Sequence, residues 1–332
     1  ENASFSFLNS QLQSFYDKEA FELLEKPLFK IWLMYDQATA HTYTLKRMME
    51  TALRCNVAIR IVNVDAFLFY CDNSAENGVK LTYDNKPIEQ LPDVVLCRLG
   101  AMRCNAHSMR VLRVLQKLTV VLNHDAPIQT AANKLETAFA LAANGVETPK
   151  TIPLNVTNAA ATRKLVTDAL GYPVVIKTAI GSQGDGVMLI DNEARLAELC
   201  GLLDKQRQFL AQEFIAASAG SDVRVWVVGN KCVAAMRRKG AEGAGIRANI
   251  HQGGSATNVE LTDALCKVAI GAAQALGLDM AGVDLLERGD GRFCVCEVNA
   301  AAGIEAFEHA TGKDVALSLI ELCARKFNES KN

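Results

Sequence analysis

Two polar side chains interrupt an apolar segment near the end of the chain. The segment FCVCEVN, residues 293–299, carries Glu297 and Asn299 among apolar residues. Because side chains alternate along a strand, these two are expected on one face and Cys296 on the other. Desolvating a carboxamide without a partner costs about 2 kcal/mol or more, and a carboxylate costs more still. The segment therefore predicts a partner for these two groups.

A third oxygen donor, Asp284, lies in the preceding apolar segment, GVDLLE. An antiparallel pairing across the intervening GDG turn brings Asp284 near Glu297 and Asn299. Two neighbouring carboxylates repel each other unless a cation lies between them. Oxygen donors suit Mg²⁺, which usually keeps phosphate oxygens as further ligands. We therefore predict a metal site at Asp284, Glu297 and Asn299; the spacing leaves open a polar strand end satisfied within the protein.

The segment KTAIGSQGDGV, residues 177–187, has the composition of a phosphate-binding turn. Lys177 ends an apolar strand, and Gly181, Gly184 and Gly186 leave the following backbone free to turn its N–H groups toward phosphate oxygens. The pattern is neither GxGxxG nor GxxxxGK[ST], so no helix N-terminus is expected to hold the nucleotide. An ordinary glycine-rich hairpin is the alternative.

Arg237 and Arg238 end a predicted strand. A guanidinium group binds a carboxylate through two parallel hydrogen bonds, so the pair could clamp the carboxylates of a substrate. Neighbours on a strand point to opposite faces, and only one of the two is expected to enter a cleft. A solvated basic strand end is the alternative.

Composition limits the classes of protein to which the chain could belong. Half of its 332 residues are hydrophobic and 22% are charged, which predicts a folded protein with a large core. A net charge of −2 gives no basic field for nucleic acid. No run reaches the roughly 18 apolar residues of a membrane span. We therefore expect neither nucleic acid nor a membrane as a partner, and a homo-oligomer is possible.

Ten cysteines are scattered through mostly apolar runs, without the spacing of a zinc site or a redox pair. The first 26 residues lack the basic start and hydrophobic stretch of a signal peptide. We therefore expect free thiols and a location in a reducing cytoplasm. Residues 1–26 are expected to form an amphipathic arm.

Strands and helices alternate over residues 27–122, which predicts a largely parallel α/β sheet. The expected strands are 30–36, 57–64, 92–100 and 119–123, and the expected helices are 43–55 and 108–118. From 123 to 212 the pattern predicts a helix at 133–145, a hairpin over 172–191, a helix at 192–204 and a strand at 209–215. From 213 to 332 it predicts a hairpin over 221–239, a helix at 262–277, a strand pair over 281–299 and a final helix at 314–327.

Five blocks carry a resemblance to a known family, in this order: PVVIKTAIGSQGDGV, QEFIAASAGSDVRVWVVGNKCVAAMRR, IRANIHQGG, LGLDMAGVDLLE and CEVNAAAGIEAFEHATG. From about Lys30 to the last helix the chain resembles the RimK-like amino-acid ligases of the ATP-grasp superfamily. The resemblance implies an ATP-grasp fold of mixed α/β and α+β class. An N-terminal pre-ATP-grasp α/β domain, 27–122, would precede two lobes, 123–212 and 213–332, with ATP between the lobes.

The resemblance also implies roles for individual residues. It places Lys134 and Lys177 on the phosphates of ATP, and Asp284, Glu297 and Asn299 on Mg²⁺, with Mn²⁺ as an alternative. Further ATP contacts are implied for the loop residues Gly181, Ser182, Gln183, Gly184 and Gly186, for Glu213 and Phe214 at adenine, for Asp222 at ribose, and for Arg247 and Asn249 at the phosphates. Lys177 and Arg247 are the expected catalytic residues.

The chain departs from the family at two places. Ala248 replaces the serine of the family's R-S-N block, so a hydroxyl is missing there. Ala301 and Ala302 replace the serine and proline that usually follow the metal-binding asparagine. The second change borders the acceptor site, so the sequence leaves the acceptor unnamed.

The activity implied by the resemblance is ATP-dependent ligation of a carboxylate to an amine. The carboxylate would take the γ-phosphate of ATP and form an acyl-phosphate, and the amine of an amino acid such as glutamate would then displace phosphate. The acceptor would be a small molecule or a peptide. Two alternatives are an ATP-grasp kinase that phosphorylates a hydroxyl group and a non-catalytic nucleotide-binding protein.

Overall fold

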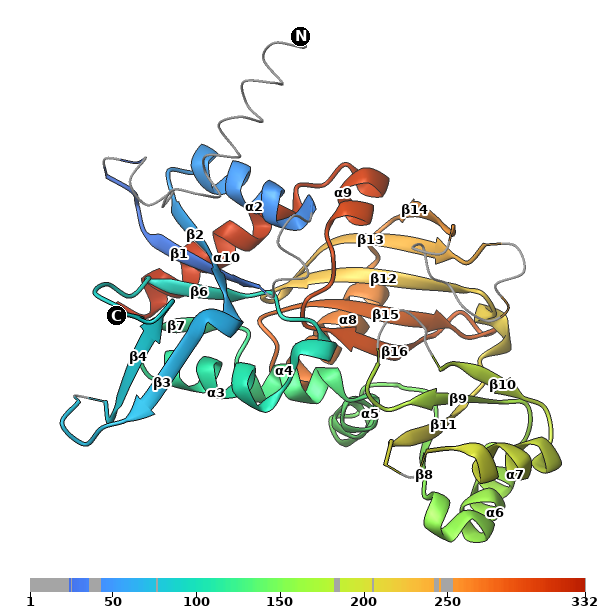
Figure 1. The fold of residues 1–332 in the computed structure, drawn as a ribbon. Helices are drawn as coiled ribbons and strands as arrows, with labels where there is room; N and C mark the ends of the chain where they lie inside the picture. The colour runs from blue at the N-terminus through green and yellow to red at the C-terminus, as the bar shows by residue number, and fades with distance from the viewer. Residues whose placement is uncertain are drawn as a thin grey trace. The chain divides into compact units, whose positions relative to one another are not determined.

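The protein is described by a computed structural model that covers residues 24, 26–35, 43–75, 77–181, 186–204, 206–241, 245 and 253–331. These residues divide into two compact units (Figure 1). The first unit contains the described residues up to Leu99, together with Asn105–Asp125 and Ala316–Asn332, and the second contains Gly100–Cys104 and Ala126–Val315. The expected arm at 1–26 lies almost wholly outside the described residues.

The first unit contains the parallel sheet that the alternating pattern predicts. Its strands follow the order β2-β1-β6-β7 and every neighbouring pair is parallel. All four residues of β6 are buried, as expected for a strand in a sheet covered on both faces. The bounds are Lys30–Tyr35 for β1, Ala58–Asn63 for β2, Val94–Cys97 for β6 and Val120–Leu122 for β7.

Helices of the first unit follow the same pattern. In α2, Tyr43–Arg54, one stripe of side chains is buried, including Leu45, Met48 and Met49. Asn105 caps α3, Ala106–Leu115, by accepting a hydrogen bond from the backbone N–H of Ser108.

The last helix, α10 (Val315–Glu329), groups with the first unit, whereas the sequence had suggested a C-terminal lobe running to 332. Its Phe327 stacks on Phe29, just before β1, with ring centroids 5.4 Å apart. An aromatic contact across almost the whole length of the chain leaves no signal in the local pattern of α10.

A small antiparallel sheet lies between β2 and β6 in sequence and was not expected. It follows the order β3-β4-β5, with bounds Phe67–Cys71, Val79–Tyr83 and Lys86–Pro87. A 3₁₀ turn, η3 (Val64–Ala66), leads into it. Phe67 is fully buried, and its ring packs against Trp32 and Tyr83 at centroid distances of 5.7 and 4.8 Å.

The second unit begins with a sheet in the order β10-β9-β11-β8, all antiparallel. The pairing of β9 with β10 confirms the hairpin expected across the glycine-rich turn. Val166 of α6 and Leu196 of α7 are fully buried against this sheet. The bounds are Asp125–Ala132 for α4, Lys134–Ala143 for α5, Thr151–Leu154 for β8, Ala159–Ala169 for α6, Val174–Thr178 for β9, Met188–Ile190 for β10, Glu193–Leu202 for α7 and Phe209–Glu213 for β11.

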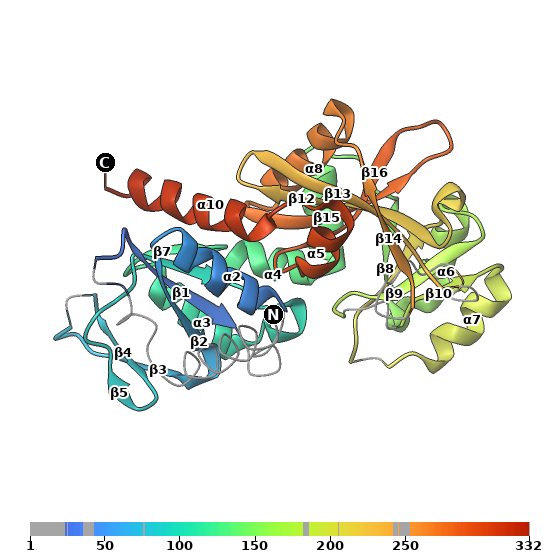
Figure 2. The same cartoon turned by 90° about the horizontal axis from the view of Figure 1, so that it is seen from above.

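A larger antiparallel sheet completes the second unit, in the order β14-β13-β12-β15-β16. Helix α8 packs against β12, β13, β15 and β16 (Figure 2). Thr262 caps α8, as the sequence predicts, by accepting from the N–H of Leu265. The bounds are Ser221–Val228 for β12, Lys231–Lys239 for β13, Ser255–Val259 for β14, Asp263–Ala275 for α8, Met280–Glu287 for β15, Phe293–Asn299 for β16 and Glu305–Thr311 for α9, with 3₁₀ turns at Ala101–Arg103 (η4), Val156–Asn158 (η5) and Ala216–Ser218 (η6).

Two expectations from composition can be compared with the described residues. Within the described ranges, no helix has the length and apolar character needed to cross a membrane. Each of the ten cysteines lies in these ranges and carries a free thiol. The cytoplasmic location stays a prediction.

Candidate active site

The three predicted metal ligands lie together on β15 and β16. The antiparallel register sets Asp284 opposite Glu297 and Gly282 opposite Asn299. The carboxamide of Asn299 donates a hydrogen bond to Asp284 Oδ2 at 3.5 Å. The pairing across the GDG turn, predicted from the sequence, is therefore observed.

A β-bulge changes which side chains face this group. The register shifts between Asp284 and Leu285, so that Cys296 is an extra residue in β16. The strict alternation expected for this strand is therefore wrong at Cys296. Its Sγ lies 3.4 Å from Lys177 Nζ, within the group of side chains from which alternation had excluded it. Burial raises the pKa of the Cys296 thiol, which keeps it protonated.

Asp284 is 3% exposed, and its carboxylate forms ion pairs with two guanidinium groups. Arg224 lies opposite it on β12 and donates to both carboxylate oxygens, with Nη2 2.6 Å from Oδ2. Nη2 of Arg238 donates to the same oxygen at 2.9 Å. Burial alone would raise the pKa of Asp284, but Arg224 and Arg238 outweigh it and hold that pKa below its ordinary value. Asp284 is thus ionised in a preformed cationic setting.

The same sheet face continues to Asp222, which lies opposite Arg238 in the β12–β13 pairing. Arg238 donates to both oxygens of Asp222, at 2.7 and 2.6 Å. Burial, followed by the neighbouring Asp284 charge, raises the pKa of Asp222 against the opposing effect of Arg238. The ribose role of Asp222 stays a prediction; its observed partner is Arg238.

The two adjacent arginines have different partners, as the alternation predicts. Arg238 is 7% exposed and lies with Asp222 and Asp284. Arg237 instead donates to Glu287 at 2.9 Å, and both of these side chains are partly exposed. Arg238 is therefore the arginine on the face of the site. The structure shows it bound to two carboxylates of the protein, and a contact with substrate stays a prediction.

Both predicted phosphate lysines reach this region, one from helix α5 and one from strand β9. Lys134 is the first residue of α5, and its Nζ donates to the carbonyl of Gly181 at 2.9 Å and lies 3.4 Å from Glu297 Oε1. Lys177, on β9, donates to Gln212 Oε1 at 2.8 Å. The two cationic groups thus lie beside β16, the strand that carries Glu297 and Asn299.

The described glycines of the predicted phosphate loop pack against one side chain, Thr178. A Cβ at Gly181 would lie 2.8 Å from Thr178 Oγ1, and one at Gly186 would lie 3.1 Å from Thr178 Cγ2. Gly186 also has φ near +72°, which favours glycine. Both ends of the loop therefore require glycine for steric reasons. Ser182, Gln183 and Gly184 lie outside the described residues, and so do Arg247 and Asn249.

Of the two residues predicted at adenine, Glu213 is the last residue of β11 and Phe214 follows it directly. The carboxylate of Glu213 accepts hydrogen bonds from Arg288, at 3.0 and 3.3 Å, and from the N–H of Lys150 at 3.0 Å. The Arg288 hydrogen bond holds the pKa of Glu213 below its ordinary value. The side chain of Glu213 thus belongs to an ion pair, and adenine recognition through backbone groups stays a prediction.

The alanines that replace the family's serine and proline follow β16. Ala302 is 5% exposed and lies over β15, because a Cβ built on Gly282 would come within 2.4 Å of the Ala302 Cβ. Gly282 precedes Asp284 by two residues, so this close contact fixes the segment after Asn299 beside the candidate metal ligands.

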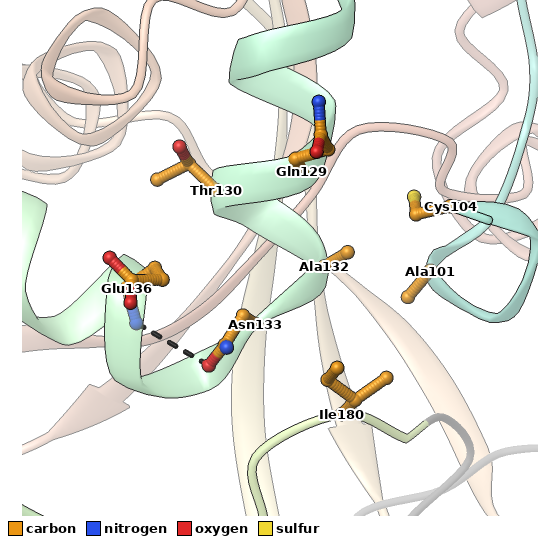
Figure 3. Close-up of a pocket in the computed structure, with 8 residues that line it drawn as sticks. All are labelled: Ala101, Cys104, Gln129, Thr130, Ala132, Asn133, Glu136 and Ile180. Atoms are coloured by element: carbon orange, nitrogen blue, oxygen red, sulfur yellow. Dashed lines mark hydrogen bonds between the residues drawn. The ribbon is translucent and has the colours of Figure 1, made fainter. Parts of the chain in front are cut away.

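A cavity of about 330 Å³ lies in the second unit, and Figure 3 shows the side chains that line it. Asn133 and Ile180, which line it, are the sequence neighbours of Lys134 and Gly181, whose side chain and carbonyl are hydrogen-bonded. Asn133 also caps α5 through the N–H of Glu136, at 3.5 Å. The lining residues are Ala101, Cys104, Gln129, Thr130, Ala132, Asn133, Glu136 and Ile180. Space for a ligand is therefore available next to the predicted phosphate site.

Sequence reasoning missed Arg224, Gln212 and Cys296. Arg224 stands two residues after Asp222, on the same face of β12, but its contact with Asp284 depends on the pairing of β12 with β15. Gln212 directly precedes Glu213, but its contact with Lys177 depends on the pairing of β11 with β9. Cys296 was missed because the β-bulge interrupts the alternation from which its orientation was predicted.

The donor set fits Mg²⁺, which proteins usually bind through one or two carboxylates together with substrate phosphates. Asp284 and Glu297 supply carboxylates and Asn299 supplies a carboxamide oxygen. Among the described side chains, no group of three or more His, Cys, Asp or Glu could hold a metal by itself. A metal at this site would therefore depend on further ligands such as phosphate.

Comparison with known proteins identifies the family. The model of the RimK-like ATP-grasp domain matches residues 131–323. A protein named probable alpha-L-glutamate ligase, from Marinobacter nauticus, is 35% identical over 295 residues, which cover 88% of this chain and 94% of that protein. A protein of the same name from Halorhodospira halophila is 37% identical over 291 residues, covering 87% and 93% of the two chains.

A solved structure supports the fold independently. The ATP-grasp ligase PsnB, complexed with its minimal precursor, Mg and ADP, superposes with a TM-score of 0.66 at 18% identity and covers 90% of this chain and 98% of its own. At that identity the likeness speaks for the fold alone. The ATP-grasp fold expected from the sequence is thus confirmed, and ATP-grasp ligases use ATP and Mg²⁺. The chain belongs to the RimK-like ATP-grasp family and is an ATP-dependent ligase that joins a carboxylate to an amine through a C–N bond.

Proposed function

We propose that the protein adds an amino acid, with glutamate the first candidate, to a carboxylate of a small-molecule or peptide acceptor. The names of the two curated relatives support glutamate. A second structure of PsnB, complexed with precursor peptide PsnA2 and AMPPNP, supports a peptide as one class of acceptor. The reaction would proceed through an acyl-phosphate.

One observation carries the proposal: Lys134 of α5 and Lys177 of β9 lie against β16, the strand that carries Glu297. Lys134 Nζ lies 3.4 Å from Glu297 Oε1, and Lys177 Nζ lies 3.4 Å from Cys296 Sγ, the residue before Glu297. Phosphoryl transfer needs charge neutralisation and alignment more than covalent participation by the enzyme. Lys134 and Lys177 are proposed to bind the phosphates of ATP, and Lys177 also to stabilise the charge that develops during transfer.

Asp284, Glu297 and Asn299 are proposed to hold Mg²⁺, with Mn²⁺ as an alternative. A divalent ion there would supply positive charge to the phosphate oxygens. Arg224 and Arg238 contribute by keeping Asp284 ionised and fixed in one orientation. The site therefore combines cationic side chains with a small set of oxygen ligands.

In the proposed reaction the acceptor carboxylate attacks the γ-phosphorus of ATP and ADP leaves. The amine nitrogen then attacks the acyl carbon, the C–O bond to phosphate breaks, and phosphate departs with one former carboxylate oxygen. The amine gives up a proton as the amide forms. No serine or cysteine nucleophile is needed, which agrees with a protonated Cys296 thiol.

The remaining roles are proposed from the family pattern. The adenine would lie against Glu213 and Phe214, the ribose near Asp222, and the phosphates beneath the loop that contains Ser182, Gln183 and Gly184. Arg247 and Asn249 would contact the transferred phosphate, and Arg237 or Arg238 the substrate carboxylate. Of these, Asp222 and Arg238 already bind each other, so a substrate contact by either would be made by an ion-paired group.

The test is a screen for ADP release with MgATP, each of the common amino acids and a panel of acceptor carboxylates, with products identified by mass spectrometry. The expected result is ADP and amide in equal amounts, with glutamate among the active amines. Addition of hydroxylamine in place of the amine should trap the acyl-phosphate as a hydroxamate. A stable phosphoester, or ADP formed without either product, would refute ligation.

A further inference from the structure

Gln212 is a buried polar residue at the centre of the first sheet of the second unit. It is 4% exposed and lies on β11, between Thr151 of β8 and Val175 of β9. A carboxamide at such a position must find partners for both its donor and its acceptor. The hydrogen-bond partners of Gln212 therefore indicate its role.

The partners of Gln212 form a directed chain of hydrogen bonds. The hydroxyl of Thr151 donates to the carbonyl of Pro149 at 2.9 Å, which leaves its oxygen to act as an acceptor. Gln212 Nε2 donates to that oxygen at 3.0 Å. Gln212 Oε1 therefore faces the other way, where it accepts from Lys177 Nζ at 2.8 Å. Thr151 thus determines which end of the carboxamide meets the lysine.

Cys296 confines Lys177 from another side. Its Sγ lies 3.4 Å from Lys177 Nζ and 3.9 Å from Gln212 Oε1. An ammonium group has three N–H donors. Two are directed to Gln212 and Cys296, so the third has a defined direction in which it can meet a phosphate oxygen.

The neutrality of these partners is chemically significant. A carboxylate in place of Gln212 would also accept from Lys177, but it would cancel the lysine charge and repel phosphate. The carboxamide of Gln212 holds the ammonium group in place and leaves its charge intact.

We infer that Gln212, oriented by Thr151, is a positioning residue that holds Lys177 for the phosphates of ATP without neutralising it. This inference rests on the proposed role of Lys177 as a phosphate ligand. It gives a role to two residues to which the resemblance assigned none, and it explains why a carboxamide occupies a buried position of β11.

The test compares binding of three nucleotide probes, adenosine, ADP and AMPPNP, by calorimetry with Mg²⁺ present. The isosteric change Gln212→Glu should lower the affinities for ADP and AMPPNP by about tenfold or more, as expected for loss of a charge-assisted contact. The affinity for adenosine should stay within twofold of wild type. A role in folding alone would weaken all three probes equally. Equal weakening, or unchanged AMPPNP affinity, would overturn the inference.

Thr151→Val provides a second variant with almost no change in volume. It should weaken AMPPNP by about threefold to tenfold, because the carboxamide loses the group that orients it. Combined with Gln212→Glu it should add little further loss, because the two residues act through one chain. Full additivity of the two losses of AMPPNP affinity would contradict the proposed chain of hydrogen bonds from Thr151 through Gln212 to Lys177.

Thr162→Val is the matched control, since Thr162 is another threonine of the same lobe and is buried. Its hydroxyl donates only to the backbone carbonyls of Asn155 and Asn158, at 3.2 and 3.0 Å. It should leave the affinities for all three probes unchanged, and an effect equal to that of Thr151→Val would overturn the inference. Lys177→Met separates the phosphate role of Lys177 from the positioning role of Gln212. If Lys177→Met binds AMPPNP normally, the proposed phosphate role of Lys177 fails. If Lys177→Met binds AMPPNP weakly but Gln212→Glu binds it normally, only the positioning role is refuted.

Discussion

At the scale of single residues, the two adjacent arginines give the clearest contrast. Arg238 is buried between Asp222 and Asp284, so Arg238→Met would leave two buried carboxylates without this partner. The expected loss of unfolding free energy is about 3–5 kcal/mol. Arg237 has only a partly exposed ion pair with Glu287, and Arg237→Met should cost about 1 kcal/mol or less. Urea denaturation of both variants checks the order, and equal losses would contradict the assigned burial.

The metal ligands were accessible to sequence reasoning because their chemistry conflicts with the apolar strands that carry them. Asp284, Glu297 and Asn299 needed only alternation and one hairpin to be brought together. Arg224 was missed because its pairing with Asp284 requires β12 to lie next to β15, and the order of strands across a sheet is not written in any local pattern.

At the scale of elements, the contact between β15 and the segment after β16 can be tested with one methyl group. Gly282→Ala would bring a Cβ to 2.4 Å from the Ala302 Cβ and force one segment to move. We expect a loss of about 1–3 kcal/mol, as for overpacking of a core, together with reduced ligase turnover. Gly289→Ala in the turn after β15 is the control, because a Cβ there meets nothing within 4 Å. Similar thermal unfolding of the two variants would show that the contact has no consequence.

The ion pair of Glu213 with Arg288 joins the end of β11 to the β15–β16 turn and predicts a pH dependence. The pKa of Glu213 is lowered in the folded protein, so the pair stabilises the fold above the ordinary value of 4.5 and loses its effect as the pH falls through the folded pKa. Glu213→Gln should therefore cost about 1 kcal/mol near pH 7 and progressively less below about pH 4.5. Unfolding free energies measured from pH 7 to 3.5 check this, and a pH-independent difference would refute it. Because adenine is proposed to be recognised by backbone groups, Glu213→Gln should bind adenosine with the affinity of wild type.

The elements themselves were largely predictable, since apolar periodicity and caps identify β1, α2, α8 and the hairpin of β12 with β13. The bulge at Cys296 was not, because a shift of register depends on how two strands fit together in space. The sheet of β3, β4 and β5 was also missed. Its strands are short and mostly exposed, apart from the buried Phe67, and therefore lack a regular apolar pattern.

At the scale of the whole molecule, the consecutive domains expected from the sequence stay a prediction. The compact units join segments far apart in sequence, since α10 from the end of the chain groups with the sheet that contains β1. The family blocks rest on residue types that the chemistry requires. The ligase activity therefore followed from the sequence, while the neighbours of Lys177 and Asp284 required the fold.

The central claim is that the carboxylate is activated by phosphoryl transfer from ATP, and the fate of its oxygen tests this most directly. The acceptor found by the ADP screen is labelled with ¹⁸O in its carboxylate and turned over with MgATP and the amine. The account predicts one labelled oxygen in the released phosphate for each amide formed, with ADP as the other product. Glu297→Gln should produce neither amide nor labelled phosphate. Unlabelled phosphate alongside amide, or AMP in place of ADP, would contradict the account.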